Sequence, residues 1–276
     1  MPKEKSVLIT GCSSGIGLCC ALGLKARGYR VFASARKPGD MQALEHQGLE
    51  ALPLDLDNSE SIRSAVSEIL NRTNGVLYAL FNNGAYGQGG AVEDLSRRAL
   101  REQFETNIFG WVELTNNVLP VMRKQGYGRI IQNSSILGFM ALKYRGAYIA
   151  SKYAIEGLSD TLRLELRDTN IYVSLIQPGP IKSKFRENAY PKFLEHIDTN
   201  NSAHSAHYKK VIERYKAEGA VQPFTLPPEA VLKRVIHALE SPRPKNHYPV
   251  TFPTYLFAYL KRILPSRALD RILEKI

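Results

Sequence analysis

Residues 10–17 read Thr10-Gly11-Cys12-Ser13-Ser14-Gly15-Ile16-Gly17, and this stretch decides the fold. It follows the apolar run Val7-Leu8-Ile9 and precedes a helical pattern that begins at Ile16. Glycine lets a backbone turn tightly and approach a pyrophosphate, and a helix N-terminus offers free N–H groups and a partial positive charge. The stretch therefore predicts a dinucleotide-binding turn made of Gly11, Ser13, Ser14, Gly15, Ile16 and Gly17. A tight structural turn without a ligand uses the same residue types, and this alternative stays open.

Short apolar or β-branched runs alternate with helical patterns over the first 180 residues, as a parallel sheet with crossover helices requires. We predict strands at Ser6–Thr10, Arg30–Ala35, Glu50–Leu54, Val76–Asn82, Arg129–Asn133, Tyr172–Gln177 and Tyr248–Thr251. We predict helices at Ile16–Arg27, Glu60–Asn71 with Asn58 or Ser59 as its cap, Arg97–Gln125 with an interruption near Pro120, Tyr148–Arg167 and Pro228–Glu240. No repeat or low-complexity linker interrupts this order. The predicted fold is therefore a single α/β domain over residues 1–276, a doubly wound parallel sheet of the Rossmann type in three α/β/α layers.

The composition excludes several classes of protein. The chain has 276 residues, 44% of them apolar, which is unlike a disordered or collagen-like chain. The three cysteines, Cys12, Cys19 and Cys20, lie too close together for a disulfide framework and favour a reducing compartment. The apolar run before Gly11 is too short for a secretory signal, and no apolar run reaches the roughly 18 residues of a membrane span. We therefore expect a cytoplasmic protein.

Charge is unevenly distributed along the chain. There are 37 basic and 26 acidic residues in all, and from Ile181 onward there are 17 basic and 9 acidic ones. These charges are scattered and no binding motif accompanies them, so we expect no nucleic-acid partner. His204 and His207 could share a helix face as metal ligands, but no third ligand has suitable spacing, so we expect no metal.

The end of the second predicted strand indicates which dinucleotide would bind. An acidic residue at this position would hydrogen-bond the ribose 2′-hydroxyl of NAD. The sequence instead reads Ala33-Ser34-Ala35-Arg36-Lys37. A guanidinium suits a 2′-phosphate, so Arg36 predicts NADP as the cofactor. The alternative is that Arg36 is an ordinary solvated surface charge.

Tyr148 and Lys152 are four residues apart at the start of a long helical pattern, so the phenol and the ammonium share one helix face. A free phenol has a pKa near 10 and is a poor base at neutral pH. A cation about 5 Å away would lower that pKa by about two units, which makes Tyr148 a usable general acid or base. The same pair also occurs by chance on amphipathic helices.

Taken together, in this order and spacing, these motifs resemble the short-chain dehydrogenase/reductase family from Lys5 to about Val250, and most closely its 17β-hydroxysteroid and retinol dehydrogenase branch. The resemblance implies that Tyr148 gives its proton to a carbonyl oxygen that Ser135 holds. It implies that Lys152 lowers the tyrosine pKa and bonds the nicotinamide ribose, and that Asn107 holds a water. The further cofactor contacts that the resemblance implies are Asp55, Asn82, Pro178, Gly179, Ile181 and Ser183.

Two positions depart from the pattern of that family. Where it usually has Asn-Asn-Ala-Gly, this chain has Asn82-Asn83-Gly84-Ala85, so the glycine comes one position early and the loop toward the ribose could run differently. The family's threonine after the proline-glycine pair is Ser183 here, which keeps the hydroxyl.

The resemblance implies hydride transfer between NADP(H) and a hydrophobic aldehyde or ketone, or the matching alcohol, of the long-chain aldehyde, steroid or retinoid type. It also implies a homodimer or homotetramer. One alternative is a 3-oxoacyl-carrier-protein reductase, whose basic surface would dock an acidic carrier. Another is a non-catalytic NADP-sensing or scaffold protein, which predicts a damaged set of catalytic residues, whereas all four are present.

Two segments remain outside this pattern. Residues 183–223 lack strand character, and we expect them to form a mobile lid over an apolar pocket whose opposite wall is 136–142. The aromatic residues expected on this lid and beside it are Phe185, Tyr190, Phe193, Tyr208, Tyr215 and Phe224. Residues 253–276 form a C-terminal helical extension that would contact a membrane surface weakly or cover the substrate entrance. Packing onto the domain core is the alternative.

Overall fold

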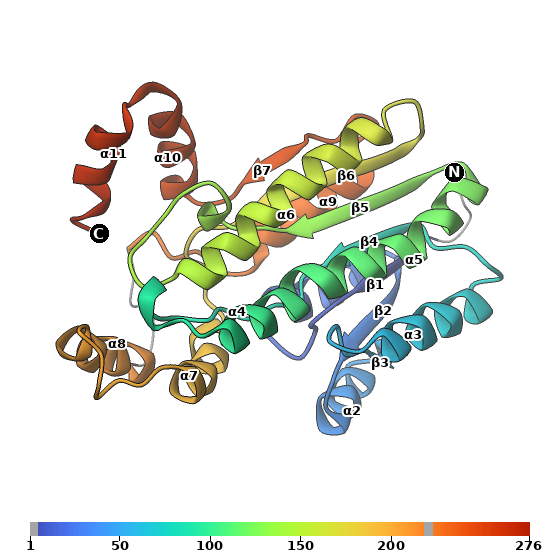
Figure 1. Cartoon of the computed structure of the whole chain (residues 1–276). Helices are drawn as coiled ribbons and strands as arrows, with labels where there is room; N and C mark the ends of the chain where they lie inside the picture. The colour runs from blue at the N-terminus through green and yellow to red at the C-terminus, as the bar shows by residue number, and fades with distance from the viewer. Residues whose placement is uncertain (1–4, 218–222) are drawn as a thin grey trace.

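The computed structural model describes residues 5–217 and 223–276; the predicted lid and the first residues of the predicted domain therefore lie partly outside the described residues. Seven parallel strands form one sheet in the order β3-β2-β1-β4-β5-β6-β7 (Figure 1). The strands are β1 Ser6–Ile9, β2 Arg30–Ala35, β3 Glu50–Pro53, β4 Ala79–Asn82, β5 Gly128–Asn133, β6 Ile171–Gln177 and β7 His247–Pro249. The strand order reverses direction at β1, as in doubly wound sheets, so the predicted Rossmann-type fold is confirmed.

Helices cover both faces of the sheet. The helices are α1 Gly15–Ala26, α2 Pro38–His46, α3 Ser59–Arg72, α4 Arg97–Phe104, α5 Gly110–Gln125, α6 Gly146–Glu165, α7 Phe185–His196, α8 Ser205–Lys216, α9 Glu229–Glu240, α10 Phe252–Ile263 and α11 Ser266–Leu273. Figure 1 shows α3, α5 and α6 side by side across one face. Successive strand residues point to opposite faces, so β1 places Leu8 in the core under α3 and α5, and Val7 and Ile9 in the core under α1 and α9.

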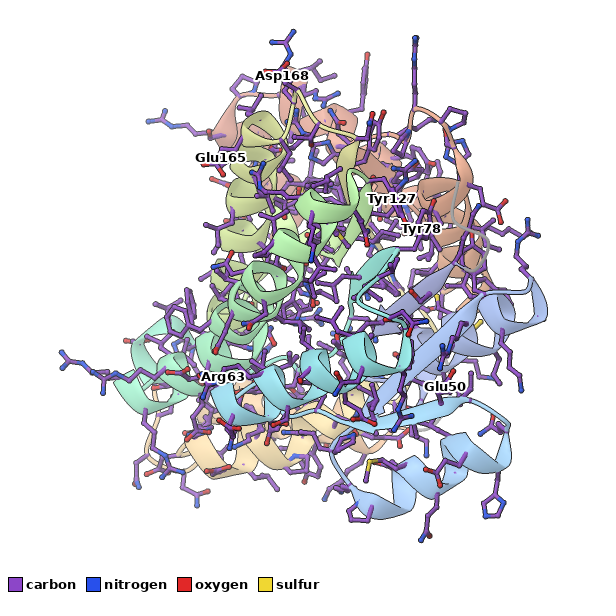
Figure 2. All side chains as sticks on the ribbon, turned by 90° about the vertical axis from the view of Figure 1, so that its right-hand side faces the viewer. Glu50, Arg63, Tyr78, Tyr127, Glu165 and Asp168 are labelled. Atoms are coloured by element: carbon purple, nitrogen blue, oxygen red, sulfur yellow. The ribbon has the colours of Figure 1, made fainter. Side chains whose placement is uncertain are left out.

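Aromatic side chains cover the amino-terminal end of the sheet, where the parallel strands begin. Tyr29, Tyr78 and Tyr127 each precede a strand, and the ring centroids of Tyr78 lie 6.4 Å from Tyr29 and 6.3 Å from Tyr127. Figure 2 shows Tyr78 and Tyr127 together at this edge. Predicted functional residues such as Arg36, Asp55 and Ser135 come directly after strands, so they belong to the opposite end of the sheet, where the parallel strands end.

The boundaries of several elements differ from the sequence predictions. Helix α5 continues through Pro120, so the predicted interruption there is wrong. Pro120 is exposed and so is Asn116, whose carbonyl would otherwise accept the missing hydrogen bond, so water can replace the missing donor. The helix is instead interrupted by a π-helical segment, Glu105–Phe109. The helix α2, which begins with Pro38 at its first position, was not predicted.

Other local predictions hold. The Asn58 side chain accepts a hydrogen bond of 3.0 Å from the Ser61 N–H and so caps α3.

Residues 183–223 are not an irregular connection, because they contain α7 and α8; residues 218–222 of this segment lie outside the described residues. Among the described residues, no helix is both long and apolar enough to cross a membrane.

The three cysteines form no disulfide. Burial raises the pKa of the Cys12 thiol to about 12 and that of Cys19 to about 11, and it also raises the pKa of Cys20. All three side chains are therefore protonated thiols at neutral pH, packed beside the first turn of α1.

Candidate active site

The glycine-rich turn lies between β1 and α1, as predicted. Gly11 and Gly15 have φ angles of 70° and 58°, which favour glycine. A Cβ atom on Gly17 would lie 2.2 Å from the Gly11 carbonyl oxygen, so no side chain fits there. Ser14 precedes the helix in an extended conformation, and its side chain does not cap α1. The turn is a shallow backbone cradle at a helix N-terminus, which fits a pyrophosphate.

The loop after β4, with its early glycine at position 84, lies against this turn. A Cβ atom on Gly84 would lie 3.2 Å from the Gly11 backbone nitrogen. A Cβ atom on Gly11 would lie 2.6 Å from the Gly84 Cα, so the two backbones touch. The Thr10 hydroxyl accepts hydrogen bonds of 2.8 Å from the N–H groups of both Asn83 and Gly84. The loop after β4 is thus fixed against the turn after β1 by its sequence.

Arg36 and Asp55 lie next to the turn. The Cys12 N–H donates to the Ser34 carbonyl over 2.8 Å, which joins the turn to the end of β2 and so to Arg36. Arg36 is exposed, and no described residue forms a hydrogen bond or ion pair with its guanidinium. Asp55 is half-buried after β3, where its carboxylate accepts from the Asp57 N–H. The predicted contacts of Arg36 and Asp55 with a bound dinucleotide stay predictions.

Ser135, Tyr148 and Lys152 converge at the carboxyl end of β5. Tyr148 lies in the first turn of α6, and the hydroxyl of Ser135 is close enough to its phenol to lower the pKa of that phenol. The same serine oxygen accepts 3.1 Å from the Leu137 N–H. Lys152 is buried, and its Nζ donates 2.7 Å to the Asn133 carbonyl and lies 4.5 Å from the centroid of the Trp111 ring. The sequence therefore identified three side chains that the fold brings together.

Burial controls the protonation of this group. Desolvation raises the pKa of Tyr148 to about 12, although the Ser135 hydrogen bond and the charge of Arg145 lower it in part. Desolvation also lowers the pKa of Lys152 to about 7, which the charge of Glu156 partly offsets. The expectation that Lys152 lowers the pKa of Tyr148 below its ordinary value is wrong for this structure, because burial outweighs the neighbouring charges.

Asn107 lies in the π-helical segment between α4 and α5. Its Oδ1 accepts 3.2 Å from the Tyr86 N–H, and its Nδ2 donates 3.0 Å to the Tyr86 carbonyl and 3.1 Å to the Ser151 hydroxyl. The side chain thus ties the segment after β4 to α6, one residue before Lys152. π-Helical segments often occur at functional sites. Its predicted role in holding a water stays a prediction.

The remaining predicted cofactor contacts fall into two groups: Pro178, Gly179, Ile181 and Ser183, which lie after β6, and Asn82, the last residue of β4. Ser183 lies against the glycine turn, since a Cβ atom on Gly15 would lie 3.0 Å from the Ser183 Cβ. The Pro178 carbonyl accepts 2.8 Å from the Ile136 N–H, and so it lies beside the serine segment. Ile181 forms a β-bridge with Leu226, and Gly179 packs against Thr251. Asn82 points into the core, where its Nδ2 donates to Thr115 while its Oδ1 has no partner among the described residues.

Aromatic side chains cover the substrate side of Tyr148. The ring of Phe185 on α7 lies edge-on to that of Tyr148, with centroids 5.4 Å apart. Tyr215 on α8 packs against Tyr190 and Phe193. Opposite them lie Leu137, Met140 and, from α10, Phe257. The apolar pocket and the mobile lid expected between these two groups stay predictions.

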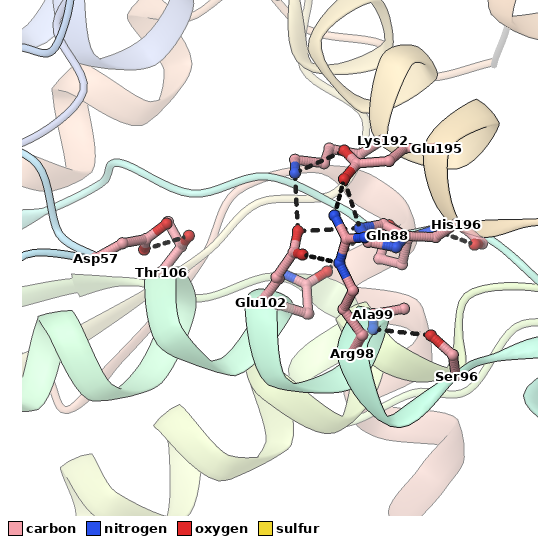
Figure 3. Close-up of polar contacts among 12 residues, drawn as sticks. Asp57, Gln88, Ser96, Arg98, Ala99, Glu102, Thr106, Lys192, Glu195 and His196 are labelled. Atoms are coloured by element: carbon pink, nitrogen blue, oxygen red, sulfur yellow. Dashed lines mark hydrogen bonds and ion pairs between the residues drawn. The ribbon is translucent and has the colours of Figure 1, made fainter.

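An ion-pair network that the sequence did not reveal fixes α7 onto α4 (Figure 3). The Lys192 ammonium lies 2.8 Å from Glu102 and 2.9 Å from Glu195, and the His196 Nε2 lies 3.0 Å from Glu102. The Glu102, Glu195 and His196 ligand atoms are close enough to hold a metal ion, but Lys192 and Arg98 already neutralise both carboxylates. The partners lie about 90 residues apart along the chain, and no local pattern marks them.

His204 and His207, the two histidines considered as metal ligands, each contact another side chain. His204 contacts the Glu93 carboxylate through its Nε2, and His207 stacks on the Tyr144 ring with a centroid distance of 3.8 Å. Both side chains are explained by packing and hydrogen bonding between α8 and the preceding loops.

A doubly wound sheet with a glycine cradle, a buried lysine, a tyrosine and a serine at its carboxyl edge defines an oxidoreductase of the dinucleotide-binding class. Residues 5–192 match the family model described as short chain dehydrogenase. The chain belongs to this family, as the sequence motifs predicted.

Relatives of known name support this assignment. The chain is 44% identical over 271 residues to "Uncharacterized oxidoreductase YbbO" of Escherichia coli (strain K12), covering 98% of this chain and 94% of the relative. It is 32% identical to retinol dehydrogenase 8 of Homo sapiens, covering 87% and 79%. A crystal structure of a short-chain dehydrogenase from Streptomyces avermitilis aligns with a TM-score of 0.77 at 26% identity, covering 99% and 97%.

Proposed function

We propose that this enzyme is an NADP(H)-dependent reductase of hydrophobic aldehydes or ketones, with the matching alcohol as product. The observation that carries the proposal is the convergence of Ser135, Tyr148 and Lys152 beside the glycine cradle and under the aromatic side chains of α7 and α8. A nicotinamide bound there would supply the hydride. The protein's own residues then have to orient the carbonyl and deliver a proton to its oxygen.

The side chains suit these tasks. The Ser135 hydroxyl can donate to a carbonyl oxygen and hold it beside the Tyr148 phenol. Because burial keeps the pKa of Tyr148 at about 12, this phenol carries its proton at neutral pH and acts as a general acid. Lys152, whose pKa is about 7, can return a proton to Tyr148 after each turnover.

The experiment is replacement of Tyr148 by Phe, which deletes the transferable proton and leaves the ring. We expect NADPH-dependent reduction of a long-chain aldehyde to fall by at least about 100-fold, since general acid catalysis contributes that much or more. NADPH binding, measured by fluorescence titration, should stay within about threefold of the unaltered enzyme. Turnover like that of the unaltered enzyme in this variant would refute the role of Tyr148.

Arg36 supports NADP as the cofactor. Its exposed guanidinium has no hydrogen-bond or ion-pair partner among the described residues and directly follows β2, beside the cradle. A free guanidinium at this position is complementary to a 2′-phosphate.

The apolar walls favour a bulky hydrophobic substrate over a small polar one, because binding would gain from apolar area removed from water. The name of one relative, retinol dehydrogenase 8, is in line with a lipophilic substrate. A 3-oxoacyl-carrier-protein reductase remains the alternative. Titration with an acyl carrier protein would distinguish the two, since only the alternative predicts a lower KM for the carrier-bound substrate.

We also propose that the enzyme works in the cytoplasm as a homodimer or homotetramer formed through α5 and α6. An apolar hollow between these helices is lined by Ile108, Phe109, Val112, Glu113, Asn116 and Leu158. Phe109 and Leu158 are largely exposed there. Light scattering of the Leu158→Glu variant should give a smaller mass than the unaltered protein.

Helices α10 and α11 form a C-terminal hairpin, whose surface supports a weak contact with a membrane. The inner face of α10 packs on the active-site segment through Phe257, while its outer face exposes Phe252, Tyr255, Leu256, Tyr259 and Ile263. Phe224 extends this outer apolar face, with its ring 5.3 Å from that of Phe252. Arg262, Arg267, Arg271 and Lys275 are exposed on the same hairpin and suit anionic lipid.

A further inference from the structure

Two arginine side chains lie next to the candidate active site and take no part in the mechanism described above. Arg145 immediately precedes α6, three residues before Tyr148, and Arg214 is on α8 beside Tyr215. Both are only partly exposed. No described residue forms a hydrogen bond or an ion pair with either guanidinium.

The segment after β4 lies beside Tyr148, Tyr215 and Arg145, which line one wall. A Cβ atom on Gly87 would lie 2.7 Å from Phe185 and 3.5 Å from Tyr148, and one on Gly89 would lie 2.7 Å from the Tyr215 hydroxyl. The next residue, Gly90, forms a β-bridge with Arg145. Moving along residues 87–90, the wall therefore passes from the catalytic tyrosine to Tyr215 and then to Arg145.

The helices of the lid hold the second arginine in place. The Arg186 Nη1 on α7 donates 3.1 Å to the backbone carbonyl of Arg214, and the Tyr190 and Tyr215 rings stack at 5.4 Å between the same two helices. The charge of Arg214 is close enough to Arg145 to lower its pKa, after burial as the larger cause. The charge of Arg145 in turn acts on Tyr148.

Two other cations near α7 have carboxylate partners. Lys192 on α7 contacts two carboxylates, and Arg98 contacts the same pair. Two partly buried guanidinium groups close together, without a carboxylate among the described residues, are unfavourable until an anion joins them. The planar guanidinium group is suited to bidentate contact with a carboxylate or a phosphate.

We propose that Arg145 and Arg214 form a subsite for an oxoanion of the substrate. The preferred substrates are then amphiphilic carbonyl compounds, in which an apolar chain lies against the aromatic walls and a carboxylate or phosphate group lies on the arginine pair. Arg145 immediately precedes the first turn of α6, which carries Tyr148, so the anionic group is separated from the reacting carbonyl by a short spacer. This inference rests on the proposed reductase function.

The test compares substrates that differ only in charge. NADPH oxidation is measured with a medium-chain γ-oxo acid, its methyl ester and the corresponding γ-oxo phosphonate, using the unaltered full-length enzyme, Arg145→Gln, Arg214→Gln and Lys209→Gln. Lys209 is an exposed cation of α8, so its loss controls for general charge effects. We expect the acid or the phosphonate to exceed the ester in kcat/KM by about 10- to 100-fold, the size of a charge-assisted contact. Whichever of the acid and the phosphonate has the larger kcat/KM identifies the preferred anion.

In each arginine variant this ratio should fall toward one, mainly through KM, and in Lys209→Gln it should stay as in the unaltered enzyme. Equal use of acid and ester by the unaltered enzyme would overturn the oxoanion subsite and leave the reductase function intact. An equal loss on acid and ester in both arginine variants would also overturn it, because the arginines would then act on Tyr148 alone. Failure of all these carbonyl compounds and of long-chain aldehydes to oxidise NADPH would instead contradict the proposed function.

Discussion

Lys152 combines full burial with a contact to a backbone carbonyl, and this makes its protonation depend on folding. Its pKa falls from 10.5 to about 7, so between these pH values the unfolded chain binds more protons than the folded one. Stability therefore increases as pH rises from about 7. The thiols oppose this trend above about pH 9, because their raised pKa values let the folded protein keep protons that the unfolded chain loses.

We therefore expect the free energy of unfolding of the cofactor-free protein to rise by roughly 1 kcal/mol between about pH 7 and pH 8.5. Urea denaturation at the two pH values measures it. Lys152→Met removes the titrating group and should flatten the rise. The same rise in that variant would show that other groups cause the pH dependence.

Arg36 allows a test of cofactor choice at a single residue. Arg36→Asp replaces a guanidinium with a carboxylate that repels a 2′-phosphate and suits a ribose hydroxyl. We expect kcat/KM for NADPH to fall by about 10- to 150-fold and use of NADH to improve. Lys37→Asp, an equal change of charge at the neighbouring exposed residue, is the control. Equal use of both cofactors by the unaltered enzyme would refute the assigned preference.

Residue identity could be predicted better than residue chemistry. The spacing of Tyr148 and Lys152 and the family resemblance at Ser135 indicated these three side chains, and the fold brings them together. It could not give the pKa of Tyr148, because that value depends on desolvation by elements distant in sequence. Arg145 and Arg214 were missed for a related reason: only the packing of α8 against the start of α6 makes them neighbours.

At the level of elements, the π-helical segment places α5 against the loop that carries Asp55. A Cβ atom on Gly110, the first residue of α5, would lie 2.1 Å from the Leu56 carbonyl oxygen. We expect Gly110→Ala to lower the free energy of unfolding by about 1–3 kcal/mol, as overpacking does. Gly157→Ala on α6, where a Cβ meets no atom within 4 Å, should stabilise the protein by about 0.5–1 kcal/mol. Thermal unfolding of both variants tests this, and equal effects would contradict it.

Element predictions succeeded where the pattern was local. The strand positions follow from short apolar or β-branched runs in the sequence. The Asn58 cap follows from the side-chain chemistry of a helix N-terminus. The π-helical segment leaves no such pattern, because Asn107 is held there by the distant Tyr86 backbone and by Ser151. Pro120 misled the prediction because its effect depends on whether water reaches the carbonyl one turn earlier.

For the whole molecule, the outer face of the C-terminal hairpin predicts a salt-dependent contact with anionic bilayers. We expect the protein to sediment with phosphatidylcholine vesicles that contain phosphatidylglycerol at low salt, and less with phosphatidylcholine alone. Tyr259→Ser combined with Ile263→Ser should weaken this binding several-fold. Leu164→Ser, at an exposed leucine of α6, should not. No sedimentation at low salt, or a change of oligomeric mass in the double variant, would assign this face to another role.

The overall fold was predictable because each parallel strand is followed by a helical pattern, which leaves few arrangements for the chain. The arrangement of α7 and α8 was not. The position of α7 depends on Glu102 and Lys192, whose pairing arises only once α4 and α7 are in place. The position of α8 depends on contacts with α7 such as that between the Tyr215 and Tyr190 rings.

The three protonated thiols offer a route to watching this enzyme move. A maleimide reacts with thiolates, so Cys12, Cys19 and Cys20 give little background labelling at neutral pH. A cysteine introduced at exposed Leu194 on α7 would react selectively in the otherwise natural sequence. A fluorophore attached there would test whether α7 moves during turnover, without the need to remove any native cysteine.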